Sequence, residues 1–338
     1  MKHRIIKFIL MICDLMGINY LFNKYNSDAI RILMYHGVSS KKLPSEYWTL
    51  LSLSKFIDQM KIIKRGYNVI KCSEIIPKSN NSLLLKDNAV VITFDDGYEN
   101  VLNEAYPILQ NHQFPAIIFV VTGLSNRNEI IWTDMVYNIA MLSKDDIVLS
   151  DNNLGTCYAK SDNKEKSDFI IKLKTYLKSC KEEKKNKIVN DLMERYPISK
   201  KQIYESFRLL SESQIKRLSE TKLIQIASHS DYHSILSQLS DDQQKDDINQ
   251  SLSKFDEWGI EIDKIFAYPN GRAEDYNNAT INILKSNNIK AAVSTTEGLH
   301  YKTDDLYRIK RISIGADINI WEFKAKLSGL YYIIDLLL

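Results

Sequence analysis

The chain has 338 residues, of which 44% are apolar and 26% charged, with only 6 prolines and 11 glycines. This composition is typical of a globular protein and excludes collagen-like and disordered chains. Its 45 basic and 42 acidic residues leave a net charge of +3, which is too balanced to indicate nucleic acid as a partner, so we expect no nucleic-acid binding. No stretch of about 18 residues is both apolar and uncharged, which excludes a polytopic membrane protein.

The first predicted element is an amphipathic N-terminal helix over residues 1–27. Lys7 and Asp14 interrupt its apolar run, and no small-x-small cleavage site follows, so the segment lacks the full pattern of a signal peptide. Such a helix either packs on the protein body or lies in a membrane interface. A second apolar helix is predicted over 321–338, and the two ends are expected to pack together or to share a membrane surface.

Between these ends, short β-rich runs alternate with amphipathic helices, which is the pattern of a parallel β/α barrel over residues 28–320. A weak strand is predicted at 67–70. The seven clear predicted strands are 31–35, 90–94, 116–121, 223–227, 265–268, 290–294 and 311–314. The helices between them are predicted at 54–64, 99–110, 241–258 and 277–286.

The interval 125–210 breaks this alternation, because it separates two strands by far more than an ordinary crossover. Lys and Glu are frequent over 160–187. This pattern predicts a helical insertion whose charged residues form a solvated face.

Polar residues directly follow four of the predicted strands: His36, the pair Asp95 and Asp96, His229, and the Y-P-N-G turn at 268–271. In a β/α barrel the C-terminal ends of the strands share one rim, where active sites lie. The sequence therefore predicts one site assembled from four separate segments.

The strongest metal-ligand pattern is H-S-D-Y-H, in which His229 and His233 are four residues apart and reach one cation together from a helical turn. Asp96 is the expected third ligand. Two imidazoles and one carboxylate leave coordination positions open for water and substrate, as a hydrolytic site requires. Adjacent residues of an extended segment point in opposite directions, so one carboxylate of the Asp95–Asp96 pair can hold the metal while the other faces the bound water as a base.

Three motifs, T-F-D-D-G at 93–97, H-S-D-Y-H at 229–233 and F-A-Y-P-N-G at 266–271, resemble the first three motifs of the polysaccharide deacetylases, the NodB-homology group or carbohydrate esterase family 4. The resemblance extends over residues 30–315 and implies an α/β fold, a distorted (β/α)7 barrel, here carrying a helical insertion and apolar N- and C-terminal helices. It also implies that Asp95 is the catalytic base. The implied ligands of one divalent metal, most simply Zn²⁺ with Co²⁺, Ni²⁺ or Fe²⁺ as alternatives, are Asp96, His229 and His233.

The chain departs from this family in its third motif. Ala267 stands where the family commonly carries an arginine that orients the base. We therefore expect Arg272 or Arg311 to orient Asp95 instead, with another group as the remaining alternative.

A second departure is the absence of the family's late leucine-x-histidine segment, which supplies the general acid. L-M-Y-H-G at 33–37 resembles the branch of poly-N-acetylglucosamine deacetylases, in which the barrel order is circularly permuted and a histidine after an early strand is the acid. His36 is the expected acid by this resemblance, with His300 as the weaker candidate.

The predicted function is metal-dependent removal of acetyl from N-acetylhexosamine units of a glycan or glycan precursor. The metal activates a water, Asp95 takes its proton, and His36 protonates the leaving amine. A backbone N–H around Asn270 is the expected oxyanion donor. The substrate-binding turn is expected to comprise Tyr268, Pro269, Asn270 and Gly271.

Several alternatives remain open at this point. The substrate is a polymer, a lipid-linked oligosaccharide or a nucleotide sugar, and an N-formyl sugar is chemically close. A glycan-binding protein without catalysis is a rival of another class, and a metal-dependent phosphoesterase would need ligands for a second metal. The termini favour a cytoplasmic protein, peripheral on the inner face of the membrane, over a membrane-anchored extracytoplasmic one. The oligomeric state is left open.

Overall fold

The computed structural model describes residues 2–77, 85–125, 129–159, 162–199 and 203–337. The outermost residues of the two predicted terminal helices, Met1 and Leu338, and three short stretches of the predicted insertion lie outside these described residues.

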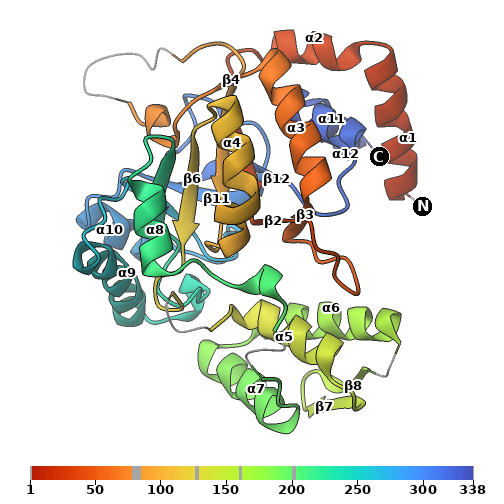
Figure 1. The fold of residues 1–338 in the computed structure, drawn as a ribbon, viewed down its shortest axis with the longest axis vertical. Helices are drawn as coiled ribbons and strands as arrows, with labels where there is room; N and C mark the ends of the chain where they lie inside the picture. Colours follow the sequence, from red (N-terminus) through yellow and green to blue (C-terminus); the bar gives the residue numbers. More distant parts are fainter. Residues whose placement is uncertain (1, 78–84, 126–128, 160–161, 200–202, 338) are drawn as a thin grey trace.

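Within the described residues, seven parallel strands close into a barrel with helices around it (Figure 1). β1 pairs with β5 on one side and with β12 on the other, so that Leu33 lies opposite both Ile92 and Ile312. The predicted (β/α)7 barrel is therefore confirmed. The strands follow one another around it in chain order: β1 (Arg31–Tyr35), β5 (Ala89–Phe94), β6 (Ala116–Val120), β9 (Ile224–Ser228), β10 (Ile265–Ala267), β11 (Ala291–Glu297) and β12 (Ile309–Ser313).

The strands are buried on both faces, which explains why they consist of continuous apolar runs rather than alternating patterns. One set of alternate residues, including Ile32, Val91 and Ile117, forms a cluster inside the barrel. The other set packs against the surrounding helices; Leu33 and Ile92, for example, share a cluster with Phe56 and Leu109.

Most outer helices begin at a polar residue whose side chain accepts from the backbone N–H three residues later, such as Ser52, Ser211 and Ser240. The helix predicted at 99–110 is a π-helical turn followed by an α-helix, and Pro107 in its first α turn lacks the N–H that a continuous α-helix needs. The remaining elements of the barrel region are β2 (Gly37–Ser39), β3 (Leu50–Ser52), α3 (Leu53–Gly66), β4 (Asn68–Val69), η1 (Cys72–Ile75), η2 (Val101–Ala105), α4 (Tyr106–His112), η3 (Glu205–Phe207), α8 (Glu212–Ser219), η4 (Leu236–Gln238), α9 (Asp241–Glu257) and α10 (Asn278–Ser286).

The insertion contains more than the helices that the sequence predicts. Its helices are α5 (Trp132–Leu142), α6 (Asn163–Ser179) and α7 (Glu182–Arg195), and an antiparallel hairpin, β7 (Ile147–Asp151) and β8 (Gly155–Ala159), lies between α5 and α6. The predicted helices are present, but the sequence analysis did not predict this hairpin, in which Ile147 and Leu149 alternate with exposed neighbours and Gly155 adopts a φ of 71° after the turn. Figure 1 shows the insertion facing the end of the barrel toward which the arrow of β6 points.

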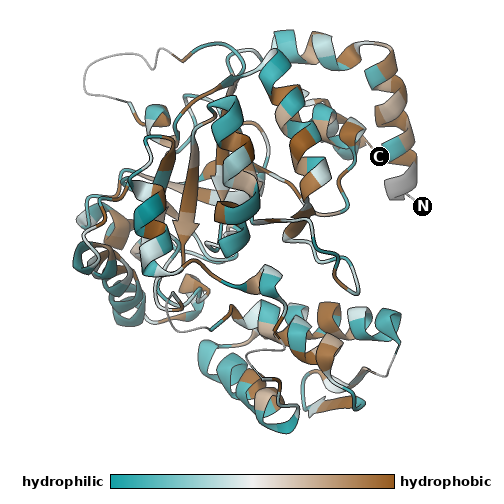
Figure 2. Ribbon diagram, viewed as in Figure 1, coloured by the Kyte–Doolittle hydropathy of each residue, from teal (hydrophilic) through white to brown (hydrophobic). Residues whose placement is uncertain are grey.

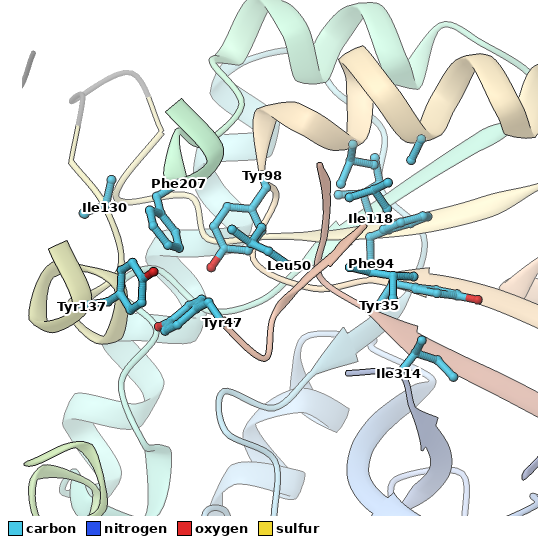
Figure 3. Close-up of a cluster of buried hydrophobic side chains, with 14 of the residues drawn as sticks. Tyr35, Tyr47, Leu50, Phe94, Tyr98, Ile118, Ile130, Tyr137, Phe207 and Ile314 are labelled. Carbon is cyan, nitrogen blue, oxygen red and sulfur yellow. The ribbon is translucent and has the colours of Figure 1, made fainter. Parts of the chain in front are cut away.

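A cluster of aromatic side chains joins the insertion to the barrel (Figure 3). Tyr47, from the loop between β2 and β3, lies 4.6 Å from the ring of Tyr137 on α5 and 5.2 Å from that of Phe207. These residues belong to the same buried cluster as Tyr35 and Phe94 at the ends of β1 and β5. The insertion is thus packed against the rim of the barrel.

Each predicted terminal helix is in fact two helices. α1 (Lys2–Leu15) and α2 (Ile18–Tyr25) meet at 84° around Gly17, and α11 (Ile320–Ser328) and α12 (Leu330–Leu337) are separated by Gly329. Both glycines have positive φ, of 75° and 88°, a conformation that ends a helix at little cost only for glycine. The prediction of one helix at each end was wrong for this reason.

The two ends of the chain pack together, as one of the sequence-based alternatives proposed. Ile6 and Leu10 of α1 share a buried cluster with Ala325 and Leu330. No single helix among the described residues has the length and apolar character to cross a bilayer. The bent pair α1 and α2 has them only when its two helices are counted together.

Candidate active site

The residues predicted for the site lie where the barrel strands end. His36 follows β1, Asp95 and Asp96 follow β5, and His229 follows β9. The turn that contains Pro269, Asn270 and Gly271 follows β10. The closed parallel barrel therefore brings all four segments to one rim.

Asp96, His229 and His233 are brought together as the predicted triad. Asp96 Oδ1 lies 3.5 Å from His229 Nε2 and 3.4 Å from His233 Nε2, and the three candidate ligand atoms all lie within 4.8 Å of one another. His229 Nδ1 lies 2.8 Å from the carbonyl oxygen of Ala267, a contact that holds the ring with Nε2 facing Asp96. Among the described groups nothing donates a hydrogen bond to the buried Asp96 Oδ1. Two imidazole nitrogens and an unsatisfied carboxylate oxygen fit one divalent cation.

The backbone of the triad differs from the helical turn that the sequence predicts. Ser230 and His233 both have positive φ, of 67° and 57°, and the backbone N–H of His233 donates to Ser230 Oγ at 2.9 Å. Asp96 is also left-handed, with a φ of 71°, and Gly97 follows it at 76°. Non-glycine residues in this region are held there by their surroundings at a cost, as is common at functional sites. The histidines converge from an irregular loop, so the expected helical turn was wrong.

Asp231, which sequence analysis passed over, holds this loop. Its fully buried carboxylate accepts from Thr122 Oγ1 at 2.7 Å and from Lys254 Nζ at 2.6 Å. Gly123 is required beside it, because a Cβ there would come within 2.5 Å of the Asp231 carbonyl oxygen. The only sign of this role in the sequence is the position of Asp231 between the two histidines. Its partners are far away in the chain: Lys254 lies on α9, and Thr122 lies in the loop after β6.

Asp95 is held by Arg311. Nη1 and Nη2 of Arg311 each donate to one carboxylate oxygen at 2.7 Å, and its Nε donates to the carbonyl oxygen of Ser294 at 2.8 Å. Burial alone would raise the pKa of Asp95, but the charge and hydrogen bonds of Arg311 outweigh it and hold that pKa below its ordinary value. Asp95 is therefore an ionised carboxylate inside a dry rim.

Arg272, the other arginine expected to orient Asp95, lies elsewhere. Its side chain is 64% exposed and faces Glu274 at 3.8 Å. Sequence proximity to the turn was misleading, because β12 lies beside β1 and β1 beside β5, which brings Arg311 and not Arg272 to Asp95.

The triad histidines differ in their tendency to bind a proton. Burial, together with the neighbouring His229, lowers the pKa of His233 to about 3 even though Asp96 opposes the shift, so its ring is neutral and its nitrogen lone pair is available. For His229, burial lowers the pKa, but the adjacent Asp96 and Asp95 reverse this and leave it raised. The pKa of Asp96 is lowered by both histidines against the opposing effect of burial.

His36 belongs to the same cluster of charges. Burial lowers its pKa, while Asp96 and Asp95 act in the opposite direction. Its ring packs edge-on against Trp48, with 4.9 Å between centroids. Trp48 fits there because Gly315 has no side chain: a Cβ would lie 2.4 Å from the indole Nε1.

His300 lies at the opposite end of the barrel. Its backbone N–H and C=O bond to Ile30, the residue before β1, whereas His36 follows β1. Its Nδ1 lies 3.6 Å from Asp304. Burial lowers its pKa, and the charges that act on that pKa are those of Asp304, Lys310 and Asp305 rather than those of the rim carboxylates. The expectation that His300 is an alternative acid was wrong.

The turn after β10 presents its backbone rather than the Tyr268 side chain. The Tyr268 ring stacks on Tyr276 at 3.8 Å, and its hydroxyl donates to the Tyr307 carbonyl, so the phenol is not part of the site. Asn270 and Gly271 have positive φ, and the Gly271 N–H closes the turn onto the Pro269 carbonyl at 2.7 Å. The Asn270 N–H donates to no group within the described chain. It is therefore available to a ligand.

A buried carboxylate behind the rim was also missed. Asp134 on α5 accepts from Tyr47 at 2.8 Å and from Tyr98 at 2.7 Å. Lys174 Nζ donates to Tyr47 at 2.9 Å. Burial and the nearby charge of Asp96 raise the pKa of Asp134 to about 7. Only the folding of the insertion onto the rim creates this network.

Comparison with known proteins identifies the family to which this chain belongs. The family model for polysaccharide deacetylases matches residues 85–145 and 176–292, together more than half of the chain. The chain belongs to the polysaccharide deacetylase family. Both the Asp95–Asp96 pair and the two triad histidines lie within the matched residues.

Individual relatives are more distant. Over 54 residues, 16% of this chain, it is 37% identical to the poly-β-1,6-N-acetyl-D-glucosamine N-deacetylase of Escherichia coli strain K12, of which the match covers 8%. A Streptococcus pyogenes deacetylase, PplD, solved in complex with acetate, has a TM-score of 0.58 at 21% identity, covering 88% of this chain and 98% of that one. IcaB from Ammonifex degensii has a TM-score of 0.56 at 17% identity, covering 89% and 97%. These structures support the barrel fold of this chain.

Proposed function

We propose that this family member is a metal-dependent N-deacetylase that removes acetyl from N-acetylhexosamine units of a glycan or glycan precursor. The observation that carries the proposal is the placement of the Asp96/His229/His233 triad beside the ionised Asp95–Arg311 pair on one rim. Hydrolysis of an amide needs an activated water, a base and an acid for the leaving amine, and this rim offers candidates for all three.

The triad would hold the metal through Asp96 Oδ1 and the Nε2 atoms of the two histidines. Zn²⁺ suits this donor set best, and Co²⁺, Ni²⁺ and Fe²⁺ are alternatives. Such a cation, when bound, polarises the amide carbonyl and makes water nucleophilic at neutral pH.

The chain's own residues supply the proton transfers. Asp95, kept ionised and oriented by Arg311, accepts a proton from the attacking water. The N–H of Asn270 stabilises the developing oxyanion. His36 protonates the leaving amine nitrogen, without which the amine could not depart.

The rival glycan-binding function lost much of its support with the structure. It rested on Ala267 and on the missing late histidine. Arg311 makes the contact with Asp95 that the absent motif arginine would make, and His36 lies among the rim charges. A phosphoesterase with two metals is disfavoured, since the described residues form one candidate ligand cluster.

The test is acetate release from β-1,6-linked N-acetylglucosamine oligomers, lipid-linked N-acetylhexosamines and nucleotide sugars. We expect release from at least one substrate, loss of activity on chelation and recovery with Zn²⁺. His233→Ala should lower bound metal at least 10-fold, as even indirect changes near metal ligands cost 10- to 100-fold, whereas His112→Ala, far from the rim, should not. Glycan binding without release, with full metal occupancy, would contradict the proposal, and faster release of formate from N-formyl analogues would redirect it.

We also propose that the terminal helices contact a lipid surface. Residues of one face of α1 remain exposed at helical spacing, including Phe8 at 59% and Leu15 at 74%, and Tyr20 and Leu21 of α2 are exposed as well. Figure 2 shows hydrophobic positions along both helices. Four basic residues and one acid occur in residues 1–25, and that acid, Asp14, is paired with Lys324. Exposed apolar and aromatic side chains in a segment with more basic than acidic residues are typical of interfacial helices.

A further inference from the structure

A cavity of about 360 Å³ borders the candidate active site on the side of the insertion. Its walls come from the loop 45–48, from α6 and from Arg272. Two contacts join it to the site: Trp48 packs on His36, and Lys178 of α6 donates to the side-chain oxygen of Asn270. A substrate with its N-acetyl group at the triad would therefore extend into this cavity.

Positive charge is concentrated in the cavity wall. Lys174, Lys178 and Arg272 line it, and within its described lining Glu46 is the one acid, on the exposed side. Lys174 donates to the Tyr47 hydroxyl and Lys178 to Asn270, so neither lysine has an ion pair with a carboxylate within the described residues.

The three cations also act on one another. Burial is the main cause that lowers the pKa of Lys174, to about 8, and Lys178 adds to it although Asp134 opposes the shift. Burial and then Arg272 lower the pKa of Lys178. Half-buried like charges are unfavourable unless a counter-charge is present, so an anion placed among them would be favoured electrostatically.

None of these cations has a role in the amide chemistry derived for the rim. Arg272 lies 3.8 Å from the exposed Glu274, but a neutral N-acetylhexosamine would bring no counter-charge to Lys174 and Lys178. The half-exposed face of Trp48, 47% accessible, adds an apolar platform beside the charges, as expected for a sugar that carries an anion.

We propose that this cavity binds an anionic oxygen group of the substrate, a phosphate or a carboxylate, next to the N-acetylhexosamine that is deacetylated. The proposal rests on the deacetylase function proposed above and narrows its substrates. A phosphate would come from a lipid-linked or nucleotide-linked sugar, and a carboxylate from a uronic acid in a polymer.

Binding of small probes to the zinc-loaded protein tests this. N-Acetylglucosamine 1-phosphate and N-acetylglucosaminuronic acid are compared with neutral N-acetylglucosamine by calorimetry. We expect at least one anionic probe to bind 10-fold or more tightly than the neutral sugar, and the tighter of the two identifies the source of the anion. Equal affinity for the neutral sugar and both anions would overturn the proposal.

Matched variants separate the cavity from the metal, since phosphate also binds Zn²⁺ directly. Lys174→Gln and Arg272→Gln should each weaken binding of the anionic probe roughly 10-fold, because charged hydrogen bonds contribute most of such affinity. Lys172→Gln removes the same charge from α6 outside the cavity and should have no effect. Arg272 is exposed, so its variant is expected to fold even if Lys174→Gln does not. If Arg272→Gln, and Lys174→Gln where folded, match Lys172→Gln, the cavity is not the anion site.

Assays of acetate release test the anion site and the deacetylase function separately. Release from neutral oligomers with no anion preference overturns the anion site and leaves the deacetylase function supported. Tight binding of anions without acetate release from any N-acetylated substrate overturns the function, and with it the assignment of the anion to a deacetylation substrate.

Discussion

In the proposed mechanism, Asp95 must satisfy two demands that conflict in a buried site: it has to remain ionised, and it has to accept a proton during the reaction. The two parallel hydrogen bonds from Arg311 meet the first demand by offsetting the effect of burial. They also fix the orientation of the carboxylate. Arg311 therefore both stabilises the charge of Asp95 and positions its carboxylate.

Asp95→Asn should lower the rate of acetate release by roughly 10² to 10⁴, because an amide cannot accept the proton. It should also leave the buried charge of Arg311 without a carboxylate to balance it, which typically costs about 3 to 5 kcal/mol of stability. Denaturant unfolding and metal content check this: we expect reduced stability with metal retained. Asp146→Asn, in an exposed turn, is the control.

The double variant Asp95→Asn/Arg311→Met separates the two effects. Removing the unpaired charge should restore much of the stability without restoring activity. Wild-type turnover in either variant would remove Asp95 from the mechanism.

In the proposed mechanism, His36 is the residue on which selectivity for amides over esters depends. An amine leaves only when protonated, whereas an activated aryl ester needs no such help. His36→Ala should therefore abolish N-deacetylation and spare much of any aryl-acetate hydrolysis, with metal retained. His300→Ala, at the other end of the barrel, should affect neither reaction; parallel loss of amide and ester hydrolysis in His36→Ala would argue against its role as acid.

At the scale of elements, the insertion completes the rim from outside the barrel. α5 contributes Asp134 to the hydroxyls of Tyr47 and Tyr98, and α6 brings Lys174 to Tyr47. This network connects four segments: α5, α6, the loop with Tyr47 and the segment after β5 with Tyr98. Through Asp134, this network also makes the stability of the protein depend on pH.

The pKa of Asp134 is raised from 3.8 to about 7 by burial and by Asp96. Its protonated form is thus favoured in the folded state, so its contribution to stability is fully present below about pH 4 and is lost as the pH rises through 7. The difference in free energy of unfolding between wild type and Asp134→Asn should change in that window, with the wild type losing stability relative to the variant as the pH rises. Urea unfolding at pH 4, 5.5 and 7 measures it, and parallel pH profiles would contradict the assignment.

On the scale of the whole molecule, the two ends of the chain form one unit on the side of the barrel. Arg31 of β1 is fully buried and donates to the carbonyl oxygens of Leu327, Ala29 and Asn26, and Asn26 donates to Ser328. The inner face of α1 is thereby anchored through α11. Its outer apolar face remains available.

Sedimentation with phospholipid vesicles tests that face. The full chain should bind vesicles containing anionic lipid more strongly than neutral ones, because positive charge accompanies the apolar face. Phe8→Ser combined with Tyr20→Ser should reduce binding several-fold without changing acetate release, whereas Ile171→Ser, an exposed apolar residue on α6, should not. Equal vesicle binding by the two sets of variants would refute the lipid contact.

The sequence alone determined the strands, the rim and the triad. Seven apolar runs with polar residues at their ends are enough, since parallel strands in a closed barrel must bring those ends together. D-D-G and H-S-D-Y-H are local patterns whose residues are positioned by their own strands, β5 and β9. Their spacing did not reveal the left-handed residues Ser230 and His233, because those conformations are imposed by packing around Asp231.

Only the tertiary structure decided between residues that sequence treats as equivalent. Arg311 rather than Arg272 reaches Asp95 because β12, β1 and β5 are neighbours around the barrel. His36 and His300 lie at opposite ends of β1. This difference arises because the segment after β11 places His300 beside Ile30, the residue that precedes β1. Asp134, Lys174 and Lys178 acquire their roles only when the insertion folds back onto the rim. Contacts between segments far apart in the chain depend on packing, which no local pattern encodes.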